Sequence, residues 1–235
     1  MPDISYLDHT GDPVPAYLAV PAGTGPWPAV VVVQDVLGMT ADLRRTAERL
    51  ADNGYLTLVP GLYGRGPKIK CMLSTMYAAV VGRGSAQQAI IAARDHLLAD
   101  ARCTGKVGLV GFCMGAQFVV QLSPGGLFDA SAPNYGVLPR DLEPLKESCP
   151  VVASFGAKDR IVPRGSAARL ESALAEGNVP RDIKEYPNVG HSFMNDWRLP
   201  PAMRKIESAV GLSYFADEAE DAWKRMTDFL EKHLA

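Results

Sequence analysis

The chain has 235 residues, of which 47% are hydrophobic and 21% are charged, and its formal net charge is −2. These values are ordinary for a globular protein, and a chain of this length buries enough apolar surface to fold without disulfide bonds or a structural metal. No run of Lys or Arg stands out, which argues against binding to nucleic acid.

Strand and helix patterns alternate along most of the chain. Runs that are apolar on both faces, such as 29–34, are typical of strands buried in a parallel sheet. Apolar residues at helical spacing, as in 40–53, indicate amphipathic helices. In chain order, the patterns predict a hairpin of 4–7 and 16–20, strand 29–34, helix 40–53, strand 55–59, helix 86–99, strand 106–110, helix 113–122, strand 151–155, helix 166–176, strand 181–186 and helix 218–233. The segment 60–84 has no clear pattern.

This alternation predicts an α/β fold, with a mostly parallel central sheet and helices on both faces. We find no repeat, low-complexity tract or long linker, so we expect one domain over residues 1–235. In such folds ligands bind beyond the carboxyl ends of the strands. Polar residues that directly follow strands are therefore the first candidates for a functional site.

The start of the chain and its cysteines bear on location and metals. We see no basic segment followed by an apolar signal region, and the run 29–33 is too short to span a membrane, so we expect a cytoplasmic protein with reduced thiols and no membrane contact. The four cysteines form no Cys-x-x-Cys pair and show no metal-ligand spacing with histidine. We expect no metal and no cofactor.

Gly111-Phe112-Cys113-Met114-Gly115 follows a buried strand and opens a helix. This is the setting of a nucleophile elbow, in which flanking glycines let strand and helix approach closely. The position at a helix N-terminus favours a thiolate. Cys113 is therefore the candidate nucleophile, and the alternative is a buried core cysteine beside packing glycines.

A thiol nucleophile needs a base, and the base needs an acid that orients it. Asp159 follows strand 151–155 and His191 follows strand 181–186, in the chain order nucleophile, acid, histidine. Each residue alone has a plain alternative: Asp159 as a turn aspartate and His191 as a surface loop histidine. The combination of all three predicts a Cys-His-Asp site.

With these motifs the chain resembles the dienelactone hydrolases, cysteine-dependent members of the α/β-hydrolase superfamily. The resemblance covers nearly the whole chain and rests on 111–115, Gly-Ala-Lys-Asp at 156–159 and Gly-His-Ser-Phe at 190–193. It implies an α/β-hydrolase fold, with Cys113, Asp159 and His191 as the catalytic residues.

The resemblance also implies accessory groups. The family has a Gln-Glu-x-x-Gly segment whose glutamate contacts the resting cysteine, and Gln34-Asp35-Val36-Leu37-Gly38 matches it with a shorter acid. Asp35 is thus the expected auxiliary acid, which a water could link to Cys113. The backbone N–H groups of Val36 and Met114 are the expected oxyanion hole.

The substrate pocket departs from the family pattern. Four residues after the histidine the family has an arginine that grips a carboxylate, whereas this chain has Asn195. We expect Leu37, Asn195 and Trp197 to line a pocket for small, largely apolar esters or lactones. The segment 196–215 is expected to be a local cap, with a surface excursion as the alternative.

These observations predict a hydrolase that cleaves small ester or lactone substrates through a thioester. A monomer is favoured, and the oligomeric state stays open. Two other functions stay open. The same nucleophile could transfer acyl groups to an acceptor other than water, or the chain could be a non-catalytic relative that binds a small molecule.

Overall fold

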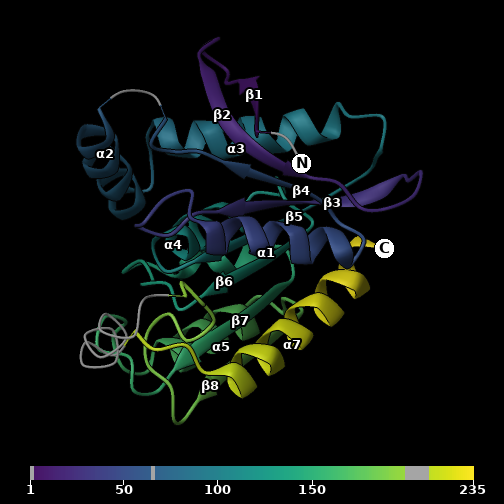
Figure 1. Ribbon diagram of the computed structural model, residues 1–235. Coiled ribbons are helices and arrows are strands. Elements are labelled where there is room, and N and C mark those ends of the chain that lie inside the picture. The colour runs from purple at the N-terminus through teal and green to yellow at the C-terminus, as the bar shows by residue number, and fades with distance from the viewer. Residues whose placement is uncertain (1–2, 65–66, 199–211) are drawn as a thin grey trace.

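The computed structural model describes residues 3–64, 67–198 and 212–235. Its centre is an eight-stranded sheet in the order β1-β2-β4-β3-β5-β6-β7-β8 (Figure 1). β1 and β2 form an antiparallel hairpin, β2 is antiparallel to β4, and the remaining strands run parallel. The strands are β1 (Asp3–Leu7), β2 (Pro13–Ala19), β3 (Trp27–Val33), β4 (Leu56–Pro60), β5 (Cys103–Phe112), β6 (Ala130–Asn134), β7 (Val151–Gly156) and β8 (Arg181–Tyr186).

Helices cover both faces of this sheet. They are α1 (Ala41–Asp52), α2 (Lys68–Val81), α3 (Ser85–Leu98), α4 (Met114–Leu122), α5 (Ser166–Glu176) and α7 (Ala216–Leu234), with a short 3-10 helix at Glu143–Glu147. In Figure 1, α1 and α7 lie in front of the sheet. β3 shows why both faces need cover: Val31 and Val33 pack in the core with α3 and α4, while Val30 and Val32 pack in the core with α1 and α7. A strand that buries alternate residues on opposite faces must be apolar throughout.

The expected mostly parallel sheet with helices on both faces is therefore confirmed. Each expected strand and helix is present, with ends that differ by at most three residues. The largest difference is β5, which was expected at 106–110 and spans Cys103–Phe112. The helix expected at 40–53 is α1, with Thr40 as its N-cap, where the hydroxyl accepts a hydrogen bond from the N–H of Leu43 at 3.2 Å.

Besides the short 3-10 helix, two elements lack a counterpart in the expectations, β6 and α2. β6 carries small residues and Pro133, which usually argue against a central strand. β6 is in register with β5 from Ala130 to Asn134, but with β7 only at Ser131. Pro133 has no N–H to donate toward β7, and the next backbone bond between the two segments runs from the N–H of Tyr135 to the carbonyl of Ser154. The unassigned segment 60–84 contains α2, whose outward face is exposed and apolar, which hides the usual amphipathic pattern.

The expected cap at 196–215 falls mostly outside the described residues, because 199–211 are not among them. No helix within the described ranges is both long and apolar enough to cross a membrane.

Candidate functional site

Cys113 lies between β5 and α4, at the carboxyl edge of the sheet. It is the N-cap of α4 and adopts φ 54° and ψ −116°, a conformation that non-glycine residues rarely take. Strain of this kind costs on the order of 1–3 kcal/mol and persists only where surrounding contacts enforce it. The turn brings the thiol to the N-terminal end of α4, where backbone N–H groups and the helix dipole favour negative charge.

The glycines on either side of Cys113 make this turn sterically possible. A Cβ at Gly111 would lie 2.6 Å from the backbone carbonyl of Gly115, and a Cβ at Gly115 would lie 2.3 Å from the carbonyl oxygen of Val33. Both distances are far below a normal contact, so α4 can approach β5 and β3 this closely only with hydrogen at these positions.

The other two residues of the expected site lie beside Cys113, His191 in direct contact with it and Asp159 through His191. Asp159 follows β7, His191 follows β8, and the sheet order places these strands side by side. The Oδ2 of Asp159 is 2.7 Å from Nδ1 of His191, and Nε2 of the same ring is 2.9 Å from the Sγ of Cys113. The imidazole and the carboxylate are both buried. The structure thus brings all three residues into one hydrogen-bonded line.

The second carboxylate oxygen of Asp159 fixes its orientation. Oδ1 accepts hydrogen bonds from the N–H groups of Ile161 at 2.7 Å and Val162 at 3.0 Å. With Oδ1 held by the backbone, Oδ2 is left to face His191. Burial by itself lowers the pKa of His191, but the hydrogen bonds to Asp159 and Cys113 outweigh it and raise that pKa to about 9. At neutral pH the site therefore favours an imidazolium next to the sulfur.

Tyr135 packs against the ring of His191, and the sequence motifs did not identify it as a site residue. It directly follows β6, is fully buried, and meets the His191 ring edge-on with centroids 5.4 Å apart. Its backbone N–H donates to the carbonyl of Ser154 on β7. β6 lies between β5, which precedes Cys113, and β7, which precedes Asp159. Tyr135 therefore packs under the imidazole of His191, which spans the gap between the thiol and the carboxylate. The only signal in the sequence is its place after a strand that was not expected.

Asp35 follows β3 and is buried near the site, but it does not bond to the thiol. Its Oδ1 accepts the N–H of Leu37 at 2.7 Å, and no hydrogen bond joins it to Cys113 in the part of the chain that the structure describes. Burial raises the pKa of Asp35 to about 6, and the charge of Asp42 adds to the rise. The carboxyl therefore changes its charge just below neutral pH.

The backbone N–H groups of Val36 and Met114 are the expected oxyanion donors. Neither donates a hydrogen bond to another group among residues 3–64, 67–198 and 212–235. Tyr63, which the motifs also missed, contacts both residues: its hydroxyl donates to the carbonyl of Val36 at 3.0 Å and lies 3.9 Å from the sulfur of Met114. The Val36–Leu37 peptide is thus held at its oxygen by Tyr63 and at its N–H by Asp35.

A family model described as "Dienelactone hydrolase family" matches residues 14–234. The chain belongs to this family.

Relatives in the dienelactone hydrolase family resemble the chain over most of its length. A protein of Escherichia coli (strain K12) named "Putative carboxymethylenebutenolidase" is 30% identical over 97% of this chain and 85% of its own. A Methylorubrum extorquens protein of the same name is 28% identical over 94% of this chain and 77% of its own. The crystal structure of a "Putative Dienelactone Hydrolase" from Klebsiella pneumoniae superposes with a TM-score of 0.76 at 25% identity, covering 98% of this chain and 99% of that one. The fold is that of an α/β-hydrolase, and the protein is a hydrolase of the dienelactone hydrolase family.

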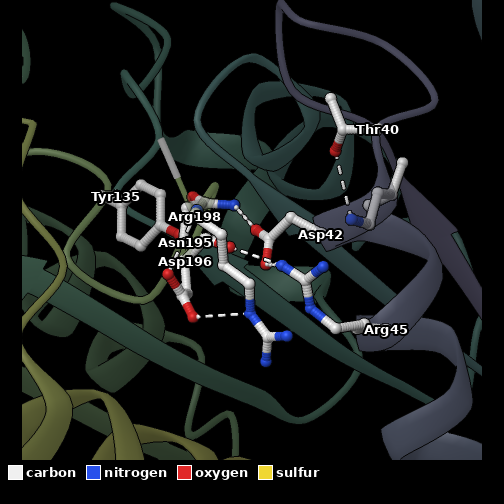
Figure 2. Close-up of polar contacts among 8 residues, drawn as sticks. Thr40, Asp42, Arg45, Tyr135, Asn195, Asp196 and Arg198 are labelled. Atoms are coloured by element: carbon white, nitrogen blue, oxygen red, sulfur yellow. Dashed lines mark hydrogen bonds and ion pairs between the residues drawn. The ribbon is translucent and has the colours of Figure 1, made fainter. Parts of the chain in front are cut away.

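Asn195 stands where the resemblance to dienelactone hydrolases places an arginine, and in the structure its side chain forms hydrogen bonds with other residues of the protein. Its Oδ1 accepts the hydroxyl of Tyr135 at 2.7 Å, and its Nδ2 donates to the carboxylate of Asp42 at 3.0 Å (Figure 2). Arg45 donates to the same carboxylate at 3.0 Å and to the backbone oxygen of Asp196 at 2.5 Å. The amide is buried and both of its ends are occupied, so we do not retain Asn195 as a substrate contact.

Leu37 and Trp197 were also expected in the pocket. Leu37 is 48% exposed and lines an open cavity beside the oxyanion loop. The indole N–H of Trp197 lies close enough to Asp35 to favour its carboxylate, which partly offsets the rise in the pKa of Asp35. This buried N–H forms no hydrogen bond of normal geometry with any described residue. Both side chains thus lie at the site, on the side of Asp35.

No group of three or more His, Cys, Asp or Glu side chains within the described ranges is arranged to hold a metal ion.

Proposed function

We propose that this member of the dienelactone hydrolase family cleaves small carboxylic esters or lactones with Cys113 as nucleophile. The observation that carries the proposal is the continuous line from Asp159 through His191 to the Sγ of Cys113, with contacts of 2.7 and 2.9 Å. A base within hydrogen-bond reach of the nucleophile, oriented by a third group, is the requirement for covalent catalysis of this type.

In the first half of the reaction the thiolate attacks the carbonyl carbon, and the oxygen takes up negative charge. The N–H groups of Val36 and Met114 stabilise that oxyanion. When the tetrahedral intermediate collapses, the bond to the alcohol oxygen breaks and His191 gives its proton to the leaving alkoxide. The products are a free alcohol and a thioester on Cys113.

In the second half His191 takes a proton from water, and the resulting hydroxide attacks the thioester. Collapse of this intermediate breaks the carbon–sulfur bond and restores the thiolate beside the imidazolium, which Asp159 stabilises. The cycle requires no cofactor. All four cysteines are unpaired, and a thiol enzyme of this kind fits a reducing compartment such as the cytoplasm.

The proposed substrate class follows from Asn195, because the family's carboxylate-binding arginine is missing at this position. Asn195 takes the position of the family's carboxylate-binding arginine, and its amide is used inside the protein. We therefore propose neutral, largely apolar substrates that need no carboxylate. A panel of neutral esters and anionic lactones of equal size tests this, and a large preference for the anionic lactones would contradict it.

Trapping the acyl-enzyme by mass spectrometry distinguishes the three functions that the sequence leaves open. After brief exposure to p-nitrophenyl acetate, we expect an acetyl group on the Cys113 peptide that disappears in water. If the acetyl group leaves only when a thiol or alcohol acceptor is added, the protein is an acyl transferase. If no acetyl group appears and no ester is turned over, the chain is a non-catalytic binder.

The raised pKa of Asp35 leads to a prediction on thiol reactivity. We expect iodoacetamide to modify Cys113 fastest of the four cysteines, in contrast to Cys149, whose pKa burial raises to about 11. A carboxylate opposes a nearby thiolate, and Asp35 ionises at about pH 6. Asp35→Asn is therefore expected to react as fast as the unmutated protein at pH 5 and roughly tenfold faster at pH 8.

Peptide mapping at each pH measures this ratio. Asp217→Asn is the control, because Asp217 is exposed at the start of α7 and should leave the rate unchanged. An Asp35→Asn ratio that is independent of pH would mean that the carboxyl does not act on the thiol.

A further inference from the structure

The open cavity that Leu37 lines beside the oxyanion loop lies on the β2 side of the sheet. Its volume is about 500 Å³, within the roughly 300–1,000 Å³ of typical small-molecule pockets. Segments far apart in the sequence form it: the start of β2, the end of β3, the loop before α1, and the turn after β4. The lining residues are Asp3, Pro15, Ala16, Gln34, Leu37, Met39, Arg44, Gly61, Tyr63 and Gly64.

Two residues connect this cavity to the proposed oxyanion hole. Leu37 lines it and directly follows Val36. Tyr63 lines it as well, and its hydroxyl reaches the carbonyl of Val36 and the sulfur of Met114. Leu37 and Tyr63 therefore place the cavity next to the residues that carry the proposed oxyanion donors.

The charged groups of the cavity wall and most of its polar groups have partners within the protein. The exception is the Nε2 of Gln34, which is buried away from solvent and meets no acceptor among the described residues. The guanidinium of Arg44 forms an ion pair with Asp3 at 2.7 Å and stacks on the ring of Tyr17 at 4.6 Å. The carbonyl oxygen of the Gln34 side chain accepts the N–H of Leu62 at 3.1 Å. The wall left for a ligand is formed by Leu37, Met39 and Pro15 and by the Tyr63 ring, which favours an apolar guest over an anion.

We propose that this cavity binds an unbranched apolar chain of the substrate, so that the enzyme prefers esters with a medium-length chain over acetate or methyl esters. This inference rests on the proposed esterase function. Burial of each additional methylene against Leu37 and Met39 should favour the longer substrate. The apolar chain of the substrate belongs to either the acyl group or the alcohol group of the ester, and the two possibilities are tested separately.

The test compares kcat/KM for p-nitrophenyl acetate and octanoate, and for ethyl and octyl acetate, in the unmutated protein and in Leu37→Trp. The larger side chain should fill the cavity mouth, while the backbone N–H of Leu37 still donates to Asp35. We expect Leu37→Trp to lower kcat/KM for the long ester of one series at least about tenfold more than for the short ester of the same series. The matched control is Leu73→Trp on α2, where Leu73 is 59% exposed and is not one of the residues that line the cavity.

A binding measurement separates failure of this inference from failure of the proposed function. In a thermal-shift assay, 1-octanol should stabilise the unmutated protein and Leu73→Trp but not Leu37→Trp. If long and short esters are cleaved equally, or if Leu37→Trp lowers both alike, the chain-binding assignment is wrong while the esterase stands. If octanol discriminates the variants but no ester is cleaved, the cavity assignment holds and the proposed function fails.

Discussion

Replacing Cys113 with alanine is expected to lower kcat/KM for small activated esters by roughly 10⁴- to 10⁶-fold, the range found when a nucleophile that acts together with its base is removed. Alanine retains the Cβ but cannot form the thioester, so both halves of the proposed cycle are lost. The fold should persist, because the glycines around the turn and the packing of α4 are unchanged.

Steady-state assays and thermal melts of the same preparations check this result. Cys103→Ala is the matched control: Cys103 is a partly buried thiol at the start of β5, at the opposite end of the strand from Cys113. Its variant should keep full activity. If Cys113→Ala keeps more than about a tenth of the activity, another residue carries the chemistry.

Asp159→Asn is expected to lower kcat/KM by roughly 10²- to 10⁴-fold, although it alters only one atom. The N–H groups of Ile161 and Val162 require an acceptor at the Oδ1 position, so the new amide must turn its NH₂ toward His191. Nδ1 then has to accept, and Nε2 carries the only ring proton, which points at Cys113. In this tautomer the neutral imidazole cannot take a proton from the thiol.

The same variant should change the pH dependence of activity. The hydrogen bond to Asp159 helps to raise the pKa of His191 to about 9, so the imidazolium that protonates the leaving group persists up to that pH. As pH rises through about 9 the imidazolium loses its proton, and activity of the unmutated enzyme should fall. Without the carboxylate this fall should begin at lower pH, by about one unit or more.

A pH–rate profile of kcat/KM from pH 5 to 10 measures this shift. Asp196→Asn is the control, since Asp196 lies in the same loop as His191 but its carboxylate pairs with the exposed Arg198. That variant should keep the alkaline limit near pH 9. An unshifted limit in Asp159→Asn would mean that Asp159 does not set the charge of His191.

Local patterns in the sequence were sufficient for much of this site. Buried strands, helix signals and the glycines around Cys113 are properties of short segments, so the order of elements and the elbow could be read directly. Because parallel strands end at one edge of the sheet, it also followed that Cys113, Asp159 and His191 would lie near one another. Their contacts of 2.7 and 2.9 Å agree with that expectation.

The supporting contacts could not be read in this way. Tyr135 depends on β6, whose proline and small residues do not look like a central strand. Asn195 looked like a substrate contact because the family pattern has an arginine there. Its actual partners are Asp42, 153 positions away, and Tyr135, 60 positions away.

By itself, then, the sequence determined the fold class and the three candidate reactive residues, because periodicity, turn glycines and strand ends are encoded within short windows. Only the tertiary structure decided what surrounds them: the support from Tyr135, the use of Asn195 inside the protein, and a cavity between Leu37 and Tyr63. These features arise where segments distant in the sequence pack together, and a buried amide binds whichever donor or acceptor that packing brings to it.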